Sequence, residues 1–171
     1  MQLVLARCTI RPWRLDDGES LAKHANNRQV WLALRDLFPH PYTIQDAHEF
    51  LQRAISEQPT TNFCIEVNSS ASGGIGIRLG QDVHRHTAEL GYWLGEKFWG
   101  RGSMTEAVMG FTDFCFDNFQ LRRIYAEPFA NNPASARVLK KAGFLFEARL
   151  KNNVIKDGQL LDSLLYAKTR L

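Results

Sequence analysis

The sequence predicts an α+β domain built on a mixed β-sheet with flanking helices, and three observations support this fold class. Strand patterns over residues 62–94 follow one another with only short polar turns between them, which is typical of an antiparallel meander. The rest of the chain then alternates between strand and helix patterns. The chain has 171 residues, of which 44% are hydrophobic, enough for one substantial core and too few to need two. We therefore expect a single domain over residues 1–171.

Each element is justified by spacing and by its terminal residues. The expected helices have apolar residues at helical spacing or helix-starting residues such as Thr43 and Pro133, and they cover 16–26, 43–58, 105–119 and 133–142. The expected strands are rich in β-prone residues and cover 9–13, 63–67, 74–79, 87–94, 123–129, 144–150 and 161–167. Residues 69–73 predict a turn, and 31–41 show no readable pattern. A ligand in such a domain is expected where the sheet opens.

Composition excludes several classes of protein. No apolar run approaches the roughly 20 residues of a membrane span, and the first residues lack a signal peptide, so we expect a soluble, cytoplasmic protein. Cys8, Cys64 and Cys115 have no metal-like or redox spacing and are expected to be buried free thiols. A net charge of +3 does not indicate a nucleic-acid partner. His84 and His86 lack a recognisable third ligand, so no metal site is expected.

A glycine-marked turn, Trp99-Gly100-Arg101-Gly102-Ser103-Met104, leads from a strand directly into a helix. The start of a helix has unpaired N–H groups and a partial positive charge, so it can hold a phosphate without a lysine. Glycines permit close backbone approach, and the arginine adds a cation. A tight turn without a ligand is the alternative interpretation. The segment has neither the Lys-Ser/Thr ending of an ATP-binding loop nor a G-x-G-x-x-G pattern, which disfavours both of those nucleotide sites.

Two motifs in the sequence resemble those of a known enzyme family. The stretch Ala88-Glu89-Leu90-Gly91-Tyr92-Trp93-Leu94, followed by the turn and Thr105-Glu106-Ala107, resembles the central motif of the GNAT acetyltransferases, in the branch that includes RimJ and RimL. The segment from Asn131 to Phe144 resembles the N-x-x-S-x-x-V-L-x-K-x-G-F segment of that branch. Weaker agreement at 11–13 and 157–162 extends the likeness over most of the chain. Trp99 replaces the usual Gln or Arg of the turn, as is common in this branch, and Met104 replaces Gly or Ala, so its side chain has to point away.

The resemblance implies the GNAT fold and transfer of an acetyl group from acetyl-CoA to a primary amine, on a protein N-terminus or a small molecule, by direct attack in a ternary complex. The backbone of Tyr92, Trp93 and Leu94 would hold the pantetheine arm, with the Leu94 N–H polarising the thioester carbonyl. Asn132 would also bind the pantetheine. The pyrophosphate would be held by the turn amides, those of Trp99, Gly100, Arg101, Gly102, Ser103, Met104 and Thr105.

The same resemblance implies the catalytic residues. Glu89 is the predicted base that takes the proton of the amine, and its alternative is an edge carboxylate in a salt bridge. Ser135 is the predicted acid that protonates the leaving thiolate, and its alternative is helix capping. Tyr166 and Glu127 are reserve candidates. Arg137 or Lys140 would meet the 3'-phosphate, unless they are solvated charges.

Other interpretations stay open at this point. A regulatory module that binds acyl-CoA without catalysis is the alternative function, because the catalytic residues rest on resemblance. The C-terminal strands allow a homodimer. Trp13, Trp31, Trp93 and Trp99 line either a pocket or the core, and only Trp93 has support from a motif. Glu106 is expected only to be a favourable carboxylate in the first turn of its helix.

Overall fold

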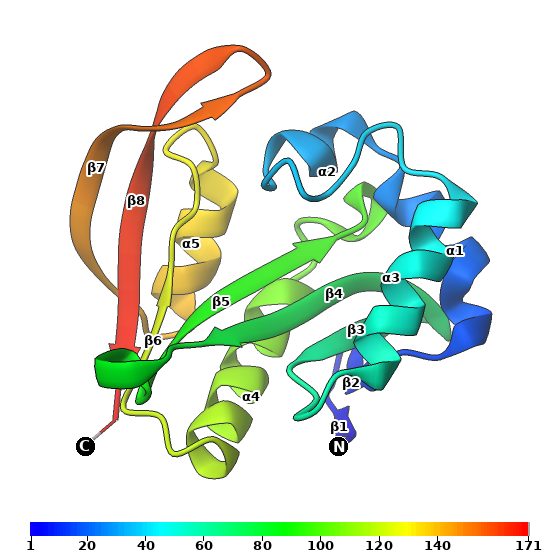
Figure 1. Ribbon diagram of the computed structural model, residues 1–171, viewed down its shortest axis with the longest axis horizontal. Coiled ribbons are helices and arrows are strands. Elements are labelled where there is room, and N and C mark those ends of the chain that lie inside the picture. Colours follow the sequence, from blue (N-terminus) through cyan, green and yellow to red (C-terminus); the bar gives the residue numbers. More distant parts are fainter. Residues whose placement is uncertain (171) are drawn as a thin grey trace.

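The strands form one mixed, eight-stranded sheet in the computed structural model, which describes residues 1–170 (Figure 1). Their order across the sheet is β1-β2-β3-β4-β5-β6-β8-β7, and neighbours pair antiparallel except for β5 and β6, which are parallel. This arrangement confirms the predicted α+β class with a mixed sheet. The strands are β1 (Leu3–Val4), β2 (Thr9–Arg11), β3 (Asn62–Val67), β4 (Ser70–Leu79), β5 (Thr87–Leu94), β6 (Arg123–Ala126), β7 (Leu145–Lys156) and β8 (Gln159–Thr169).

Helices cover both faces of the sheet, and a hydrophobic cluster lies under each group. The larger cluster packs α4 and α5 against one face, and the smaller packs α1 and α3 against the other. All three cysteines are buried free thiols, as expected. No helix among residues 1–170 is long and apolar enough to cross a membrane. The helices are α1 (Gly18–Ala25), α2 (Arg28–Leu32), α3 (Ile44–Ser56), α4 (Ser103–Asn118) and α5 (Pro133–Lys141), with short 3-10 helices at Leu15–Asp17, Asp82–His84 and Glu96–Phe98.

Several element boundaries differ from the prediction, each for a local reason. The turn expected at 69–73 lies instead at Asn68 and Ser69, both with positive φ, because Ser70 already pairs with β3. The helix expected from Thr105 begins at Ser103, directly after a left-handed N-cap glycine. The last two strands are longer than predicted and form one hairpin, and the segment without a readable pattern contains part of α2.

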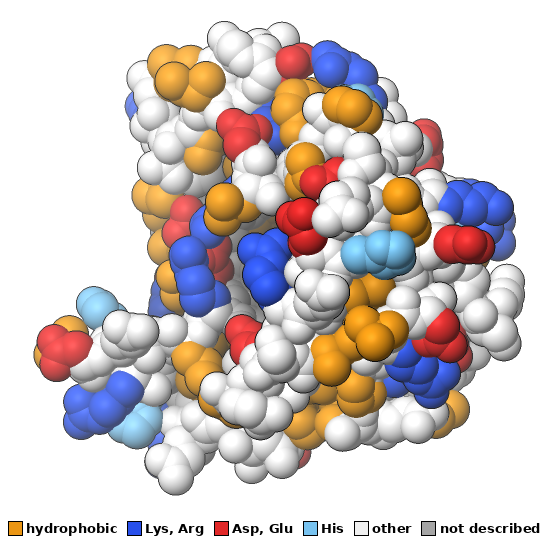
Figure 2. Space-filling view, turned by 45° about the vertical axis from the view of Figure 1, so that its right-hand side comes forward, with side chains coloured by type: hydrophobic (Ala, Val, Ile, Leu, Met, Phe, Trp, Pro, Cys, Tyr) orange, Lys and Arg blue, Asp and Glu red, His pale blue; other side chains and the backbone are white. Residues whose placement is uncertain are grey.

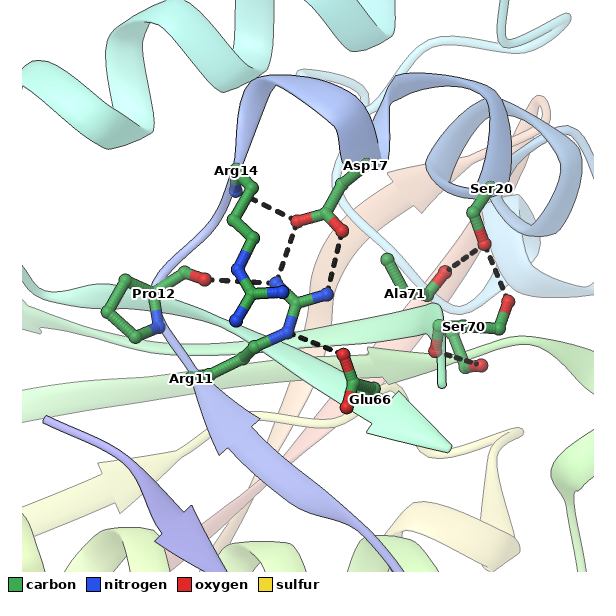
Figure 3. A network of polar contacts seen from close by, with 9 residues as sticks. Arg11, Pro12, Arg14, Asp17, Ser20, Glu66, Ser70 and Ala71 are labelled. Carbon is green, nitrogen blue, oxygen red and sulfur yellow. Dashed lines mark hydrogen bonds and ion pairs between the residues drawn. The ribbon is translucent and has the colours of Figure 1, made fainter. Parts of the chain in front are cut away.

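A buried ion-pair network engages Asp17, the N-cap residue of α1 (Figure 3). Arg11, which is 4% exposed, donates from Nη1 and Nη2 to the two carboxylate oxygens of Asp17 at 2.9 and 2.7 Å, and from Nε to Glu66 at 2.6 Å. The bonds to Asp17 are the main reason that the pKa of Arg11 is raised. Because its carboxylate is engaged with Arg11, Asp17 does not cap α1 through its side chain.

Candidate functional site

β5 and β6 separate partway along the length of β5. β6 pairs with β5 only at Thr87–Glu89, so the later residues of β5 have no strand on that side. On the other side, the Gly95 N–H donates to the Ser72 carbonyl at 2.8 Å, and hydrogen-bonded pairs alternate with non-bonded pairs along an antiparallel ladder. The N–H groups of Tyr92 and Leu94 therefore point away from β4 and into the opening.

The glycine-marked turn after β5 presents unpaired N–H groups. Gly100 and Gly102 have φ values of +73° and +84°, a region in which a side chain would be strained. No side chain caps α4, and the N–H groups of Ser103, Met104 and Thr105 have no acceptor among residues 1–170. A set of free amides at a helix start suits a phosphate group.

The two unusual residues of the turn have clear positions. The Trp99 indole Nε1 donates to the Leu94 carbonyl at 2.7 Å and so fastens the turn to the end of β5. The Met104 side chain packs against the larger hydrophobic core and does not fill the turn. The Trp93 ring packs against the smaller core and is partly buried there.

A second arginine, Arg7, lies at this turn although nothing in its local sequence indicates it. The carboxylate of Glu106 accepts hydrogen bonds from the N–H groups of Ala6 and Arg7 at 3.0 and 2.8 Å, and so holds the β1–β2 turn against α4. A Cβ atom built on Gly102 would lie 3.5 Å from the Arg7 Nε. Neither Arg7 nor Arg101 forms an ion pair within residues 1–170. Glu106 is therefore more than a favourable charge in the first helical turn.

Across the opening, the start of α5 carries the predicted polar pair. The Asn132 side chain accepts a hydrogen bond from the Ser135 N–H at 3.1 Å and is the N-cap of the helix. Since Asn132 caps the helix, the Ser135 hydroxyl is available for another contact. It lies 2.7 Å from the Tyr92 hydroxyl, which reaches it from β5. The sequence had indicated a role for the Tyr92 backbone alone.

Residues 7–145 match the family described as Acetyltransferase (GNAT) domain. The chain belongs to the GNAT acetyltransferase family. Membership makes it an acetyl-CoA-dependent N-acetyltransferase, and the alternative of a binding module without catalysis is not favoured.

Relatives with solved structures or curated names agree with this membership. The chain is 27% identical to the uncharacterized N-acetyltransferase p20 of Bacillus licheniformis, over 96% of this chain and 94% of that protein. It is 33% identical to the ribosomal-protein-serine acetyltransferase of Escherichia coli over 48% of this chain and 46% of that one. The structure of Mycobacterium smegmatis RimJ in complex with CoA-disulfide has a TM-score of 0.84 at 25% identity, over 95% of this chain and 81% of that chain.

Glu89 of this acetyltransferase is held by two arginines. Its Oε1 accepts from Arg35, in the loop after α2, and its Oε2 accepts from Arg78 on β4. The side chain of Glu89 is 12% exposed. These contacts are the ion pairs of the alternative interpretation, and they leave neither oxygen without a partner.

A cavity of about 240 Å³ lies beside Arg35, between the loop after α2 and the β7–β8 hairpin. Glu127 is half-buried there, and its carboxylate has neither a hydrogen bond nor an ion pair within residues 1–170. The other lining carboxylate, that of Asp36, is paired with Lys156. Figure 2 shows acidic, basic and hydrophobic side chains side by side near the middle of the face that it presents. The cavity is lined by Arg35, Asp36, Glu127, Phe129, Val154, Ile155, Lys156 and Ser163.

One side of the cavity is closed by a set of contacts that we name the hairpin clasp, formed by Arg28, Trp31, Asp36, Lys156 and Asp157. The Lys156 Nζ lies 2.7 Å from the Asp36 carboxylate and 3.7 Å from the centre of the Trp31 ring. Arg28 pairs with Asp157 at 2.6 Å. The clasp joins parts of the chain about 120 residues apart, so local sequence patterns could not predict it.

The remaining predicted site residues lie outside these contacts. Arg137 and Lys140 are exposed on α5 and form no ion pair within the described part of the chain. Tyr166 is buried in the larger core. Among residues 1–170, no group of three or more His, Cys, Asp or Glu side chains could hold a metal ion.

Proposed function

We propose that this acetyltransferase binds acetyl-CoA along the open edge of β5, with the pyrophosphate on the glycine-marked turn. The free N–H groups of Tyr92 and Leu94, followed by the uncapped start of α4, are the observation that carries the proposal. Acetyl-CoA supplies the activated thioester. Arg7 and Arg101 add positive charge beside the turn, and Asn132 lies across the opening. Arg137 stays the predicted partner of the 3'-phosphate, with Lys140 as the other candidate.

We propose the N-terminal amine of a protein as the acceptor and the cavity beside Arg35 as its site. At about 240 Å³ the cavity is smaller than the roughly 300–1,000 Å³ of sites for drug-sized ligands, so it suits a terminal residue whose chain continues outside. Relatives are named for acetylating ribosomal proteins, which supports a protein acceptor and a cytoplasmic location. A small-molecule amine is the other outcome of an acceptor screen that follows release of the CoA thiol.

We propose Glu127 as the group that takes the proton of the acceptor ammonium, with Glu89 as the second candidate. An unpaired carboxylate in a cavity can bind and deprotonate an ammonium without giving up another partner. Glu89 would have to leave Arg35 or Arg78 first. The proposed role of Glu89 is then to orient Arg35 at the cavity.

The acceptor nitrogen loses two protons in the proposed reaction. The ammonium gives one proton to Glu127 and then to solvent, and the neutral nitrogen bonds to the acetyl carbon. When the C–S bond breaks, its electron pair stays on sulfur, which takes the Ser135 hydroxyl proton. The second proton of the nitrogen restores the serine hydroxyl through water. The Leu94 N–H stabilises the charge on the carbonyl oxygen in between.

Binding of CoA is expected to raise the melting temperature. At one hundred times the dissociation constant, CoA stabilises a folded protein by about 2.7 kcal/mol, which for this chain length corresponds to a rise of roughly 5–10 °C in differential scanning fluorimetry. ATP and NAD are expected to leave the melting temperature unchanged.

A matched pair of glycine variants localises this binding. Gly100 and Gly158 have φ values of +73° and +72°, and a Cβ on either meets nothing within 4 Å, so Gly100→Ala and Gly158→Ala carry similar backbone strain. We expect only Gly100→Ala to weaken CoA binding, because only that glycine lies at the turn. An unchanged melting temperature of the wild type with saturating CoA would contradict the cofactor site.

The choice of base is tested by two isosteric variants. Glu127→Gln is expected to lower kcat about a hundredfold, the lower end of the range for general acid–base catalysis. Glu89→Gln is expected to act mainly on KM for the acceptor, with a much smaller effect on kcat. A hundredfold loss of kcat in Glu89→Gln, with kcat retained in Glu127→Gln, would reverse the assignment.

A further inference from the structure

The Tyr92 hydroxyl and the Ser135 hydroxyl form an isolated pair across the opening of the sheet. Their oxygen atoms are 2.7 Å apart, and the Ser135 Oγ has no other polar partner within residues 1–170. Tyr92 comes from the open end of β5 and Ser135 from the first turn of α5. The pair therefore bridges the two elements between which the acetyl donor is proposed to bind.

The geometry decides which hydroxyl donates. If Ser135 donated to Tyr92, the Tyr92 proton would have only the Ser135 carbonyl as an acceptor, at 3.4 Å, which is beyond the usual 2.5–3.0 Å of an O–H···O hydrogen bond. If Tyr92 donates to Ser135, its proton is well bonded at 2.7 Å. Burial also raises the pKa of Tyr92 above its usual value, so the phenol stays a neutral donor. The second arrangement is favoured.

That arrangement leaves the Ser135 proton without an acceptor in the described chain. A hydroxyl whose oxygen already accepts from the half-buried phenol of Tyr92 can rotate its own proton only toward the remaining space. We infer that Tyr92 is a positioning residue, which holds the Ser135 hydroxyl so that its proton faces the sulfur of the acetyl donor. The inference rests on the proposed function, in which Ser135 donates to that sulfur.

A double-mutant cycle tests this coupling. Tyr92→Phe is expected to lower kcat about fivefold, the size of one neutral hydrogen bond, with KM for acetyl-CoA within about twofold of the wild type. In a Ser135→Ala background the same change is expected to have no further effect on kcat, whereas in a Ser135→Thr background, which keeps the hydroxyl, the effect returns. Tyr42→Phe, which alters a buried tyrosine of the other core, is the control and leaves kcat unchanged.

A readout without turnover follows the bound thiol itself. The ultraviolet absorbance of the thiolate, taken as the difference between complexes with CoA and with desulfo-CoA, gives the titration midpoint of the thiol. A donor aimed at the sulfur lowers that midpoint, so Tyr92→Phe is expected to raise it by about 0.7 pH unit, the equivalent of a fivefold change. Tyr42→Phe is expected to leave it unchanged.

Different outcomes test the positioning role of Tyr92 and the proposed acid role of Ser135. If Ser135→Ala keeps the wild-type kcat, the proposed acid is wrong. If Ser135→Ala lowers kcat but Tyr92→Phe changes neither kcat nor the thiol midpoint, the acid stands and the positioning role is overturned. An equal loss from Tyr92→Phe with and without the serine hydroxyl would show a merely structural tyrosine and would also overturn it.

Discussion

Replacing Asp17 with alanine is expected to lower the free energy of unfolding by about 3–5 kcal/mol, the usual cost of removing one partner from a buried ion pair. Arg11 would keep its charge at 4% exposure while losing two of its hydrogen bonds. Glu66 would remain as a partner, but its side chain is more exposed than that of Asp17. Urea unfolding at neutral pH, with an unchanged m-value, measures the loss.

The neighbouring residue provides the control for this prediction. Asp16 is exposed and has no hydrogen-bond or ion-pair partner within residues 1–170, so Asp16→Ala is expected to stay within about 0.5 kcal/mol of the wild type. Replacing both buried partners, as Arg11→Met with Asp17→Leu, is expected to be less destabilising than Asp17→Ala, because the charge that then loses its partner, that of Glu66, is more exposed than that of Arg11. Equal stability of Asp17→Ala and Asp16→Ala would show that the network in Figure 3 contributes little.

Gly73→Ala is expected both to destabilise the fold and to weaken CoA binding at least tenfold. A Cβ atom on Gly73 would lie 2.3 Å from the Trp93 carbonyl oxygen and 3.0 Å from the Leu94 Cα. Both of these atoms belong to the backbone of β5, so the strand has to move at the end where the donor is proposed to bind. Overpacking of this kind typically costs about 1–3 kcal/mol. Calorimetric titration with CoA, together with urea unfolding, measures both effects.

Gly91→Ala is the matched substitution on β5 itself. A Cβ atom on Gly91 meets nothing within 4 Å, so this change adds a methyl group to the same strand without displacing it. We expect stability within about 1 kcal/mol of the wild type and unchanged CoA affinity. If the two alanine variants bind CoA equally well, the position of the strand end does not control donor binding.

Local patterns predicted the parts of the fold that depend on local physics. The α+β class, the meander and the helix after the glycine-marked turn follow from apolar spacing and turn residues, and the structure confirms them. The pairing of Asp17 with Arg11 and the early start of β4 at Ser70 could not be predicted, because both depend on contacts that form only in the folded chain.

Some residues of the candidate site could be predicted from the local sequence, and others could not. The turn and the start of α5 are continuous motifs, so the sequence could indicate Gly102 and Ser135, although their proposed roles stay predictions. Arg7, Arg35 and Lys156 reach the site from other segments, and no spacing rule connects them to it. The proposal of Glu127 ahead of Glu89 also depends on the folded structure, since what distinguishes the two carboxylates is whether a cation already pairs with them.

Side chains along β5 alternate between the two faces of the sheet, which limits the sequence changes that this strand tolerates. Glu89 and Trp93 face the side of α1 and α3, whereas Tyr92 and Leu94 face α4 and α5. If donor and acceptor bind as proposed, the odd-numbered side chains of this strand face the acceptor and the even-numbered ones face the donor. Inserting a single residue within β5 would exchange the two sets beyond the insertion, while insertions in the exposed segment 81–85 are expected to be tolerated. Variation in acceptor choice is therefore expected to come from substitutions and loop lengths, with the parity of this strand preserved.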